Sequence, residues 1–148
     1  MYLLITGGCG FIGTSLIKQL LYEGNKHDIL VIDNLSVGTR DDLAQACEFV
    51  ERDQRSMVGG QCSVSSGQKS ESRGQWAEVK TEPQVELIVG DITDQVLVEQ
   101  ATRGVDCIVH LAANTGVGPS IEDPKKDMQS NILGTLNMLE AARKNEVP

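Results

Sequence analysis

The segment TGGCGFIG, residues 6–13, constrains the fold of this chain more than any other. It follows a short apolar run, residues 2–6, that is typical of a buried strand, and it opens residues 11–23, whose apolar side chains recur at near-helical spacing. Glycines in such a turn let the chain bend sharply, let a phosphate approach the backbone and let the helix pack on the strand. The helix start also offers free N–H groups and a positive dipole end. The segment predicts a dinucleotide-binding turn; a plain connecting turn is the alternative.

A carboxylate ends the next apolar strand, residues 28–33. Asp33 lies twenty residues after Gly13, where a carboxylate can accept hydrogen bonds from the ribose hydroxyls of adenosine. The same charge would repel a 2′-phosphate, so the cofactor that we expect is NAD rather than NADP. Arg40, seven residues further on, could weaken that preference. A carboxylate that merely ends a strand or turn is the alternative.

Strands and helices alternate along most of the chain, which predicts the α/β class. Four alternating strands indicate a Rossmann-type, doubly wound parallel sheet with helices on both faces and the strand order 3-2-1-4. The two later strands are expected at residues 84–90 and 106–112, and the further helices at 39–51, 94–102 and 125–144. For the helix at 39–51, Thr39 and Ser36 are both candidate N-caps.

One stretch, residues 53–76, interrupts this alternation. It is rich in Ser, Gly and Gln and has no hydrophobic period, so we interpret it as an inserted, flexible loop. A tolerated surface insertion is the simpler interpretation, and a lid over a substrate or partner is the alternative. The whole chain, residues 1–148, is then expected to form one dinucleotide-binding domain.

Composition excludes several classes of protein and of site. Hydrophobic residues make up 40% of the 148, which argues against a disordered chain, and the formal net charge of −8 argues against a nucleic-acid partner. No apolar run approaches the ~20 residues that a membrane span needs, so we expect no membrane partner. The cysteines, at positions 9, 47, 62 and 107, form no metal-binding cluster with each other or with histidine. Free thiols point to a reducing compartment, the cytoplasm.

Several segments together, in their order along the chain, resemble a known family. The glycine segment is followed by DNLSVG at 33–38, GDITD at 90–94, HLAA at 110–113, GPSIEDP at 118–124 and NILGTLNMLEAAR at 131–143. These motifs resemble the extended short-chain dehydrogenase/reductase proteins, the NAD-dependent sugar-nucleotide epimerases and dehydratases. The resemblance spans the whole chain except residues 53–76, and it implies that GPSIEDP is a loop before a long helix.

The resemblance implies a set of cofactor-binding residues. The pyrophosphate would lie at Gly7, Gly10, Phe11, Ile12 and Gly13; the adenosine ribose at Asp33 and Asn34, with Ser36 and Gly38 near its 2′ side; the adenine at Asp91 and the Ile92 amide; and the nicotinamide ribose at Leu111, Ala112, Ala113 and Thr115, with Asn131 supporting this region. Asp91 could instead cap a helix, and Asn131 could be an ordinary polar residue on a helix face. His110 is interpreted as a structural strand residue rather than a catalytic one.

The acid/base pair of the family does not match this chain. The resemblance implies a Tyr-x-x-x-Lys pair after the long helix, but the only tyrosines are Tyr2 and Tyr22. Tyr22 and Lys26 match that spacing, but we reject them because this end of the first helix lies far from the nicotinamide end in this fold. We therefore predict no catalytic residue here. The resemblance also implies that the dinucleotide-binding domain is incomplete, truncated after the fourth strand and its helix, and that the substrate domain is absent.

The predicted function is the NAD-binding, amino-terminal half of a sugar-nucleotide epimerase or dehydratase, which transfers hydride between a nucleotide sugar and NAD. The alternative is a non-catalytic NAD-binding module, or a truncated remnant without the acid/base pair. The fourth strand, central in the complete family, would be an edge here with unpaired backbone groups. We therefore expect self-association or a partner chain, through this strand or through the helix at 125–144.

Overall fold

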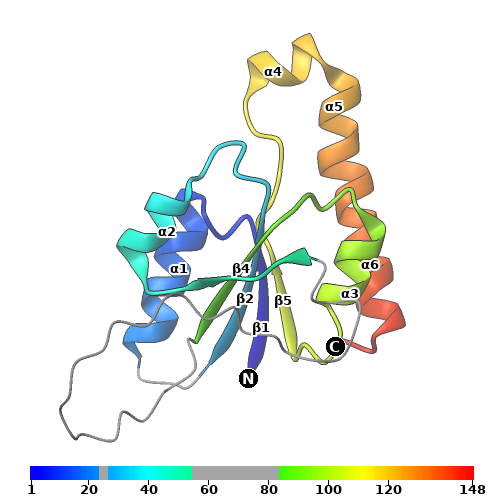
Figure 1. Ribbon diagram of the computed structural model, residues 1–148. Coiled ribbons are helices and arrows are strands. Elements are labelled where there is room, and N and C mark those ends of the chain that lie inside the picture. The colour runs from blue at the N-terminus through cyan, green and yellow to red at the C-terminus, as the bar shows by residue number, and fades with distance from the viewer. Residues whose placement is uncertain (24–26, 55–83) are drawn as a thin grey trace, which may run out of the picture.

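The computed structural model describes residues 1–23, 27–54 and 84–148. All but the first two residues of the predicted insertion at 53–76 lie outside the described residues. Every strand pair in the sheet is parallel, and the strand order is β3-β4-β2-β1-β5 (Figure 1). The strands are β1 (Tyr2–Thr6), β2 (Asp28–Asp33), β3 (Val50–Glu51), β4 (Val85–Val89) and β5 (Cys107–His110).

Helices cover both faces of this sheet (Figure 1). Alternate side chains of a strand point to opposite faces, and both faces are apolar here. Leu3 and Ile5 of β1 pack in the cluster that holds Ile17 and Leu43, from α1 (Phe11–Tyr22) and α2 (Arg40–Ala46). Leu4 packs in the opposite cluster, with side chains of α3 (Gln95–Ala101) and α6 (Gly134–Lys144). Strands buried on both faces explain the unbroken apolar runs in the sequence.

The predicted fold is confirmed. The four predicted strands correspond to β1, β2, β4 and β5, and they lie in the predicted order, because β4-β2-β1-β5 is the order 3-2-1-4. Within the described residues, β5 forms one edge of the sheet. The predicted helix at 94–102 begins after the N-cap Asp94, whose carboxylate accepts from the amides of Val96 and Leu97.

The prediction of one helix over residues 39–51 is wrong. The helix α2 ends at Ala46, Cys47 is extended, and Val50 and Glu51 form β3, which pairs with Glu86 and Leu87 of β4. A strand of two residues has no periodic signal in the sequence, so only its pairing partner reveals it. Thr39 is the N-cap, in a capping box with Asp42; Ser36 is not.

The predicted helix at 125–144 is a composite. It consists of α5 (Pro124–Met128), a π-helical turn η2 (Gln129–Leu133) and α6. The GPSIEDP segment, predicted to be a loop, instead contains the short helix α4 (Val117–Glu122), and Asp123 then caps α5 with Pro124 at its first position. Both α4 and α5 extend past the carboxyl ends of the strands (Figure 1).

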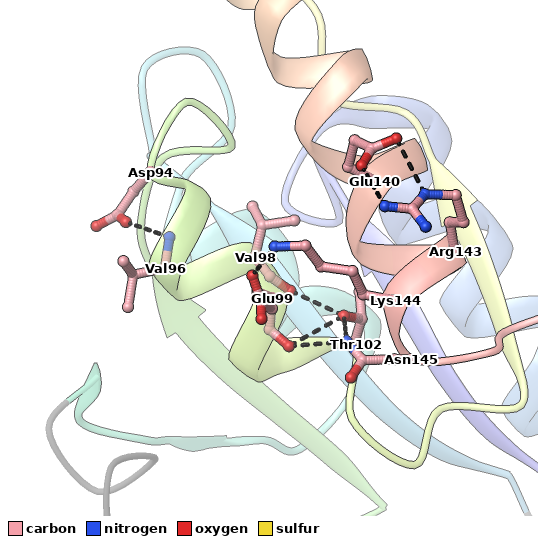
Figure 2. A network of polar contacts seen from close by, with 9 residues as sticks. All are labelled: Asp94, Val96, Val98, Glu99, Thr102, Glu140, Arg143, Lys144 and Asn145. Carbon is pink, nitrogen blue, oxygen red and sulfur yellow. Dashed lines mark hydrogen bonds and ion pairs between the residues drawn. The ribbon is translucent and has the colours of Figure 1, made fainter.

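A polar network holds α3 against the end of α6. The Asn145 side-chain amide donates to the Glu99 carbonyl at 3.0 Å and to the Thr102 hydroxyl at 2.6 Å, and Lys144 Nζ lies 2.7 Å from Glu99 Oε2 (Figure 2). One of these contacts reaches the Glu99 carbonyl in the last turn of α3, where carbonyls lack backbone partners within the helix. The two helices therefore form one layer against the sheet.

Candidate functional site

Four loops meet at the carboxyl ends of β1, β2, β4 and β5. Parallel strands place these ends at one edge of the sheet, where open α/β folds bind ligands. The loops comprise residues 7–10, 34–38, 90–94 and 111–116, so all four predicted binding segments lie on this edge. Hydrogen bonds tie neighbouring loops together, from the Gly90 amide to the Asp33 carbonyl at 3.0 Å and from the Leu111 amide to the Thr6 carbonyl at 3.1 Å.

The first loop leads into an open helix start. Gly10 is the N-cap of α1 and offers no side-chain acceptor, and the first turn contains no acidic residue. The Thr14 amide closes the first helical turn onto the Gly10 carbonyl at 2.9 Å. The amides of residues 11–13 precede that bond and have no acceptor within the helix. Phe11 and Ile12 are 89% and 65% exposed, so their side chains lie largely in solvent rather than against the loop.

Gly7 and Gly13 are required because neighbouring backbone lies too close for a side chain. Gly7 has a φ of +71°, and a Cβ there would lie 2.8 Å from the Ala112 nitrogen. A Cβ on Gly13 would lie 2.5 Å from the Gly7 carbonyl oxygen and 2.6 Å from the Gly8 Cα. Real Cβ atoms do not come so close to backbone, so a larger residue must push the helix away from the loop.

Asp33 is buried at 8% exposure beside the first loop. Its Oδ2 accepts from the Cys9 amide at 2.9 Å, and its Oδ1 accepts from the Leu35 amide at 2.8 Å. Each oxygen keeps acceptor capacity for a further donor. Arg40 forms a bidentate pair with Glu51, at 2.7 and 3.0 Å, so its charge already has a partner.

The second loop curls over the first. Ser36 and Asn34 are exposed, and the Ser36 amide donates to Asn34 Oδ1 at 3.1 Å. A Cβ on the buried Gly38 would collide with the Cys9 carbonyl, so Gly38 contributes close packing of the two loops. Burial, with the neighbouring Asp33 charge, raises the pKa of the Cys9 thiol to about 12, which keeps that thiol neutral.

Asp91 joins the second loop to the third. Its Oδ2 accepts from Asn34 Nδ2 at 2.9 Å, and its Oδ1 accepts from the amide and the hydroxyl of Thr93 at 2.8 and 2.7 Å. Burial acts to raise the pKa of this carboxyl, but the Asn34 and Thr93 hydrogen bonds outweigh it and lower the pKa. The cap of α3 is Asp94, so Asp91 does not cap that helix.

Ile92 belongs to the core rather than to the surface of the site. Its side chain is 6% exposed and packs in the cluster with α3 and α6. Asn137 of α6 donates to the Ile92 carbonyl at 3.0 Å and to the Thr93 carbonyl at 3.1 Å. The side chain of Ile92 is therefore withdrawn from the loop surface, and its carbonyl already has a partner in Asn137.

The fourth loop rests on β1. The Ala112 amide donates to Thr6 Oγ1 at 3.3 Å, while Ala113 and Thr115 are exposed. His110 bridges β1 and α6, with Nδ1 2.7 Å from Thr6 Oγ1 and Nε2 3.2 Å from Thr135 Oγ1. Burial lowers the pKa of His110. Both ring nitrogens have protein partners, which agrees with a structural role.

Asn131 lies in the π-helical turn and contacts the fourth loop. Its Oδ1 accepts from the Asn114 amide at 2.7 Å, and its Nδ2 donates to the Asn114 carbonyl at 3.0 Å. The Thr135 hydroxyl donates to the Asn131 carbonyl at 2.7 Å. Asn131 is therefore more than a polar residue on a helix face, since its side chain supports an irregular loop.

Four residues that the sequence analysis missed organise these loops. Thr6 and Asn137 hold loops from strand and helix positions, and Asn114 and Asp127 form a cluster with Asn131. A strand or helix position for a small polar residue carries no sequence signal of its own, because its partner lies far away in the chain. Asp127 is four residues before Asn131, one helical turn, which was the one available clue.

An open cavity of about 420 Å³ adjoins the outer side of the first two loops. Cys9, Gly10 and Gly38 line it from the loops, and Lys18 and Asp42 line it from α1 and α2. Its charges are of both signs, so the cavity itself favours neither an anion nor a cation.

The described residues contain neither a metal-binding cluster nor a membrane-spanning helix. Among the described ranges, no three His, Cys, Asp or Glu side chains gather as a metal site would require. In the same part of the chain, no helix combines the length and the apolar character needed to cross a membrane.

The match to known proteins decides the family. The model of the NAD dependent epimerase/dehydratase family matches residues 3–148. The chain belongs to this family. The family that the sequence motifs predicted is thereby confirmed, together with its dependence on NAD.

The curated relatives of this family are longer proteins. A dTDP-glucose 4,6-dehydratase from Mycolicibacterium smegmatis is 31% identical over 99% of this chain and 34% of its own length. A putative UDP-glucose 4-epimerase from Methanocaldococcus jannaschii is 28% identical over 98% of this chain and 35% of its own length. The chain therefore spans about a third of such relatives, rather than the half that the motifs suggested.

Solved structures of the family share the fold. DesIV, a dTDP-glucose 4,6-dehydratase from Streptomyces venezuelae solved with NAD, is 30% identical and matches 99% of this chain, and 37% of its own, with a TM-score of 0.71. A UDP-glucose 4-epimerase from Thermus thermophilus, also with NAD, is 30% identical with a TM-score of 0.66. It covers 99% of this chain and 35% of its own. The roles of individual residues in this epimerase/dehydratase chain remain predictions.

Proposed function

We propose that this chain binds NAD and supplies the cofactor-binding part of a sugar-nucleotide epimerase or dehydratase. One observation carries the proposal: the open start of α1 lies directly beside a buried carboxylate, linked by the hydrogen bond from the Cys9 amide to Asp33. Amides that lack acceptors suit a pyrophosphate, and a carboxylate with spare acceptor capacity suits ribose hydroxyls.

Different residues would bind different parts of the dinucleotide. The amides of Phe11, Ile12 and Gly13 would donate to the phosphates, and Asp33 would accept from the adenosine ribose hydroxyls. Asp91, kept ionised by its own donors, would accept from the adenine amino group. The fourth loop would line the nicotinamide ribose side. A bound NAD would supply the hydride acceptor for oxidation of a sugar hydroxyl to a carbonyl.

A nucleotide sugar is the substrate class that we propose for the whole protein. Relatives named as dTDP-glucose dehydratases and UDP-glucose epimerases support this class. The acid/base for that reaction is not among the tyrosines here. Tyr2 begins β1 at the end opposite the site, and Tyr22 ends α1 away from the open helix start.

A second candidate is a module that binds NAD without turnover by itself. The placement of Tyr2 and Tyr22 favours it for the chain of 148 residues, because neither phenol is near the four loops. An epimerase and dehydratase assay on this chain separates the two candidates. Reproducible turnover would exclude the non-catalytic module, whereas NAD binding without turnover would support it.

A calorimetric titration with NAD and NADP tests the proposed cofactor site. We expect saturable binding of NAD, weaker binding of NADP, and weaker binding of NAD by Asp33→Ala. Asp28→Ala, at the opposite end of the same strand, removes the same charge and should leave binding unchanged. A well-folded chain that binds neither dinucleotide would refute the proposal. Circular dichroism of each variant separates loss of binding from loss of fold.

We also propose that the chain associates with itself through α5, η2 and α6. Apolar side chains along this helical stretch are exposed, 65% for Ile132, 52% for Leu136 and 63% for Leu139. An exposed apolar stripe of this kind favours a partner surface. Sedimentation should show a dimer that Leu136→Glu with Leu139→Glu dissociates; a wild-type monomer at high concentration would contradict this.

The proposed compartment is the cytoplasm. Cys9, Cys47 and Cys107 are free thiols, as expected in a reducing environment. Burial raises the pKa of both Cys9 and Cys47, which makes those thiols poor nucleophiles. A fluorescent fusion of the full protein would locate it.

A further inference from the structure

A single carboxylate oxygen joins the fourth loop to α4 and to the π-helical turn η2. Oδ1 of Asp127, on α5, accepts from Ser120 Oγ at 2.8 Å, from Asn114 Nδ2 at 3.1 Å and from Asn131 Nδ2 at 3.1 Å. None of the ion pairs in the described part of the chain involves Asp127. The Ser120 and Asn114 donors, with Asn131, lower the pKa of Asp127, so it remains an ionised acceptor at neutral pH.

This carboxylate determines which way the Asn131 side chain faces. An ionised carboxylate only accepts, so the Nδ2 group of Asn131 must point toward Asp127. Oδ1 of Asn131 is then left for the Asn114 amide, at 2.7 Å. Asn114 thus receives both a backbone and a side-chain contact from the same cluster.

The cluster holds the fourth loop at a point that β1 does not reach. Hydrogen bonds to Thr6 anchor the loop at Leu111 and Ala112, directly against Gly7 of the first loop. The next anchor is Asn114, which depends on Asn131 and Asp127. Ala113 and Thr115 are exposed and flank Asn114, so the cluster sets where they lie.

We propose that Asp127 is a positioning residue, which orders residues 113–115 for the nicotinamide-ribose half of a bound dinucleotide. The proposal rests on the proposed NAD function. It follows that Asp127 affects the binding of the nicotinamide-ribose half of the cofactor and not the binding of its adenosine half. The adenosine and pyrophosphate contacts lie on the first three loops, and the Thr6 anchors do not depend on Asp127.

Two ligands separate the halves of the site. Calorimetry of the full chain should show that Asp127→Ala weakens NAD about tenfold, the size of a lost charge-assisted hydrogen bond, and changes ADP less than about twofold. Asp127→Asn keeps one acceptor oxygen and should lie between wild type and Asp127→Ala. Glu122→Gln removes an exposed charge from the neighbouring α4 and should bind both ligands like wild type.

The contrary outcomes are specific. Equal weakening of NAD and ADP would assign Asp127 a general structural role, and unchanged NAD binding would remove its role altogether. If the wild-type chain binds neither ligand, the proposed function fails instead. Hydrogen exchange of the ligand-free chain then tests whether Asp127 orders residues 113–115. Faster amide exchange at these residues in Asp127→Ala, but not in Glu122→Gln, supports the proposal. Unchanged exchange in Asp127→Ala overturns it.

Discussion

Two polar networks in this molecule use similar side chains for different purposes. At the α3–α6 contact, Thr102 and Asn145 complete the ends of regular helices, and the exposed Lys144 adds an ion pair (Figure 2). At the carboxyl ends of the strands, the side chains of Asp33, Asp91 and Asn131 form hydrogen bonds with loops. These loops lack the regular backbone hydrogen bonds of a helix or strand. The first network stabilises elements that packing already defines. The second defines the shape of the loops, so damage to it should affect binding as well as stability.

The largest expected effect is in the loop network, at Gly13. A valine there must displace the backbone of Gly7 and Gly8, so we expect a loss of about 3 kcal/mol in the free energy of unfolding, as for other overpacked sites, and loss of NAD binding. Urea unfolding and calorimetry measure the two effects. Gly118→Ala, where a Cβ meets nothing within 4 Å, is the control. If Gly13→Val bound NAD as tightly as wild type, binding would not depend on the shape of these loops.

The helix network should lose stability without losing binding. Thr102 is fully buried, and its hydroxyl donates to the Val98 carbonyl and accepts from Asn145. Thr102→Val leaves the Asn145 amide short of one acceptor, so we expect a cost of about 1–2 kcal/mol in unfolding free energy. NAD affinity should not change. Thr102→Ser, which keeps the hydroxyl, should recover much of the loss; weakened NAD binding would show that the networks are coupled.

Acid should lower the stability of the chain through His110, at the carboxyl end of β5. Burial lowers the pKa of His110 in the folded chain, so the unfolded chain binds a proton more readily. The stability from the neutral ring is fully present above pH 6.5, its ordinary pKa, and is lost as the pH falls through the lower, folded-state pKa. Unfolding free energy measured from pH 8 to pH 5 should therefore fall more steeply for wild type than for His110→Gln. Identical slopes would contradict the assignment.

The smallest effect belongs to the Glu99–Lys144 ion pair. Both side chains are more than 30% exposed, and such pairs contribute at most about 1 kcal/mol because water and salt screen them. Lys144→Met should lower the free energy of unfolding by no more than that in dilute buffer. The difference should disappear in 1 M NaCl, where screening acts over ~3 Å. A large loss that persists in 1 M NaCl would contradict this, because Met keeps most of the apolar stem and removes only the charge.

The local sequence determined the sheet and the position of its site. Apolar strand runs, the glycine turn and Asp33 at a strand end each depend on neighbours in the chain, so periodicity and turn chemistry predicted them. Thr39, one of the two candidate N-caps, caps α2 through the nearby Asp42, which is an equally local contact. The strand order also followed, because parallel βα units allow few arrangements.

Only the tertiary structure decided which polar side chains hold the loops. The two residues of β3 became a strand because β4 lay beside them, and α4 formed in a segment that motifs described as a loop. Asn34 bonds to Asp91 across 57 positions, and Asn137 reaches the Ile92 carbonyl across 45. A hydrogen bond between distant residues leaves no periodic trace in the sequence, since its energy depends on positions that folding alone brings together.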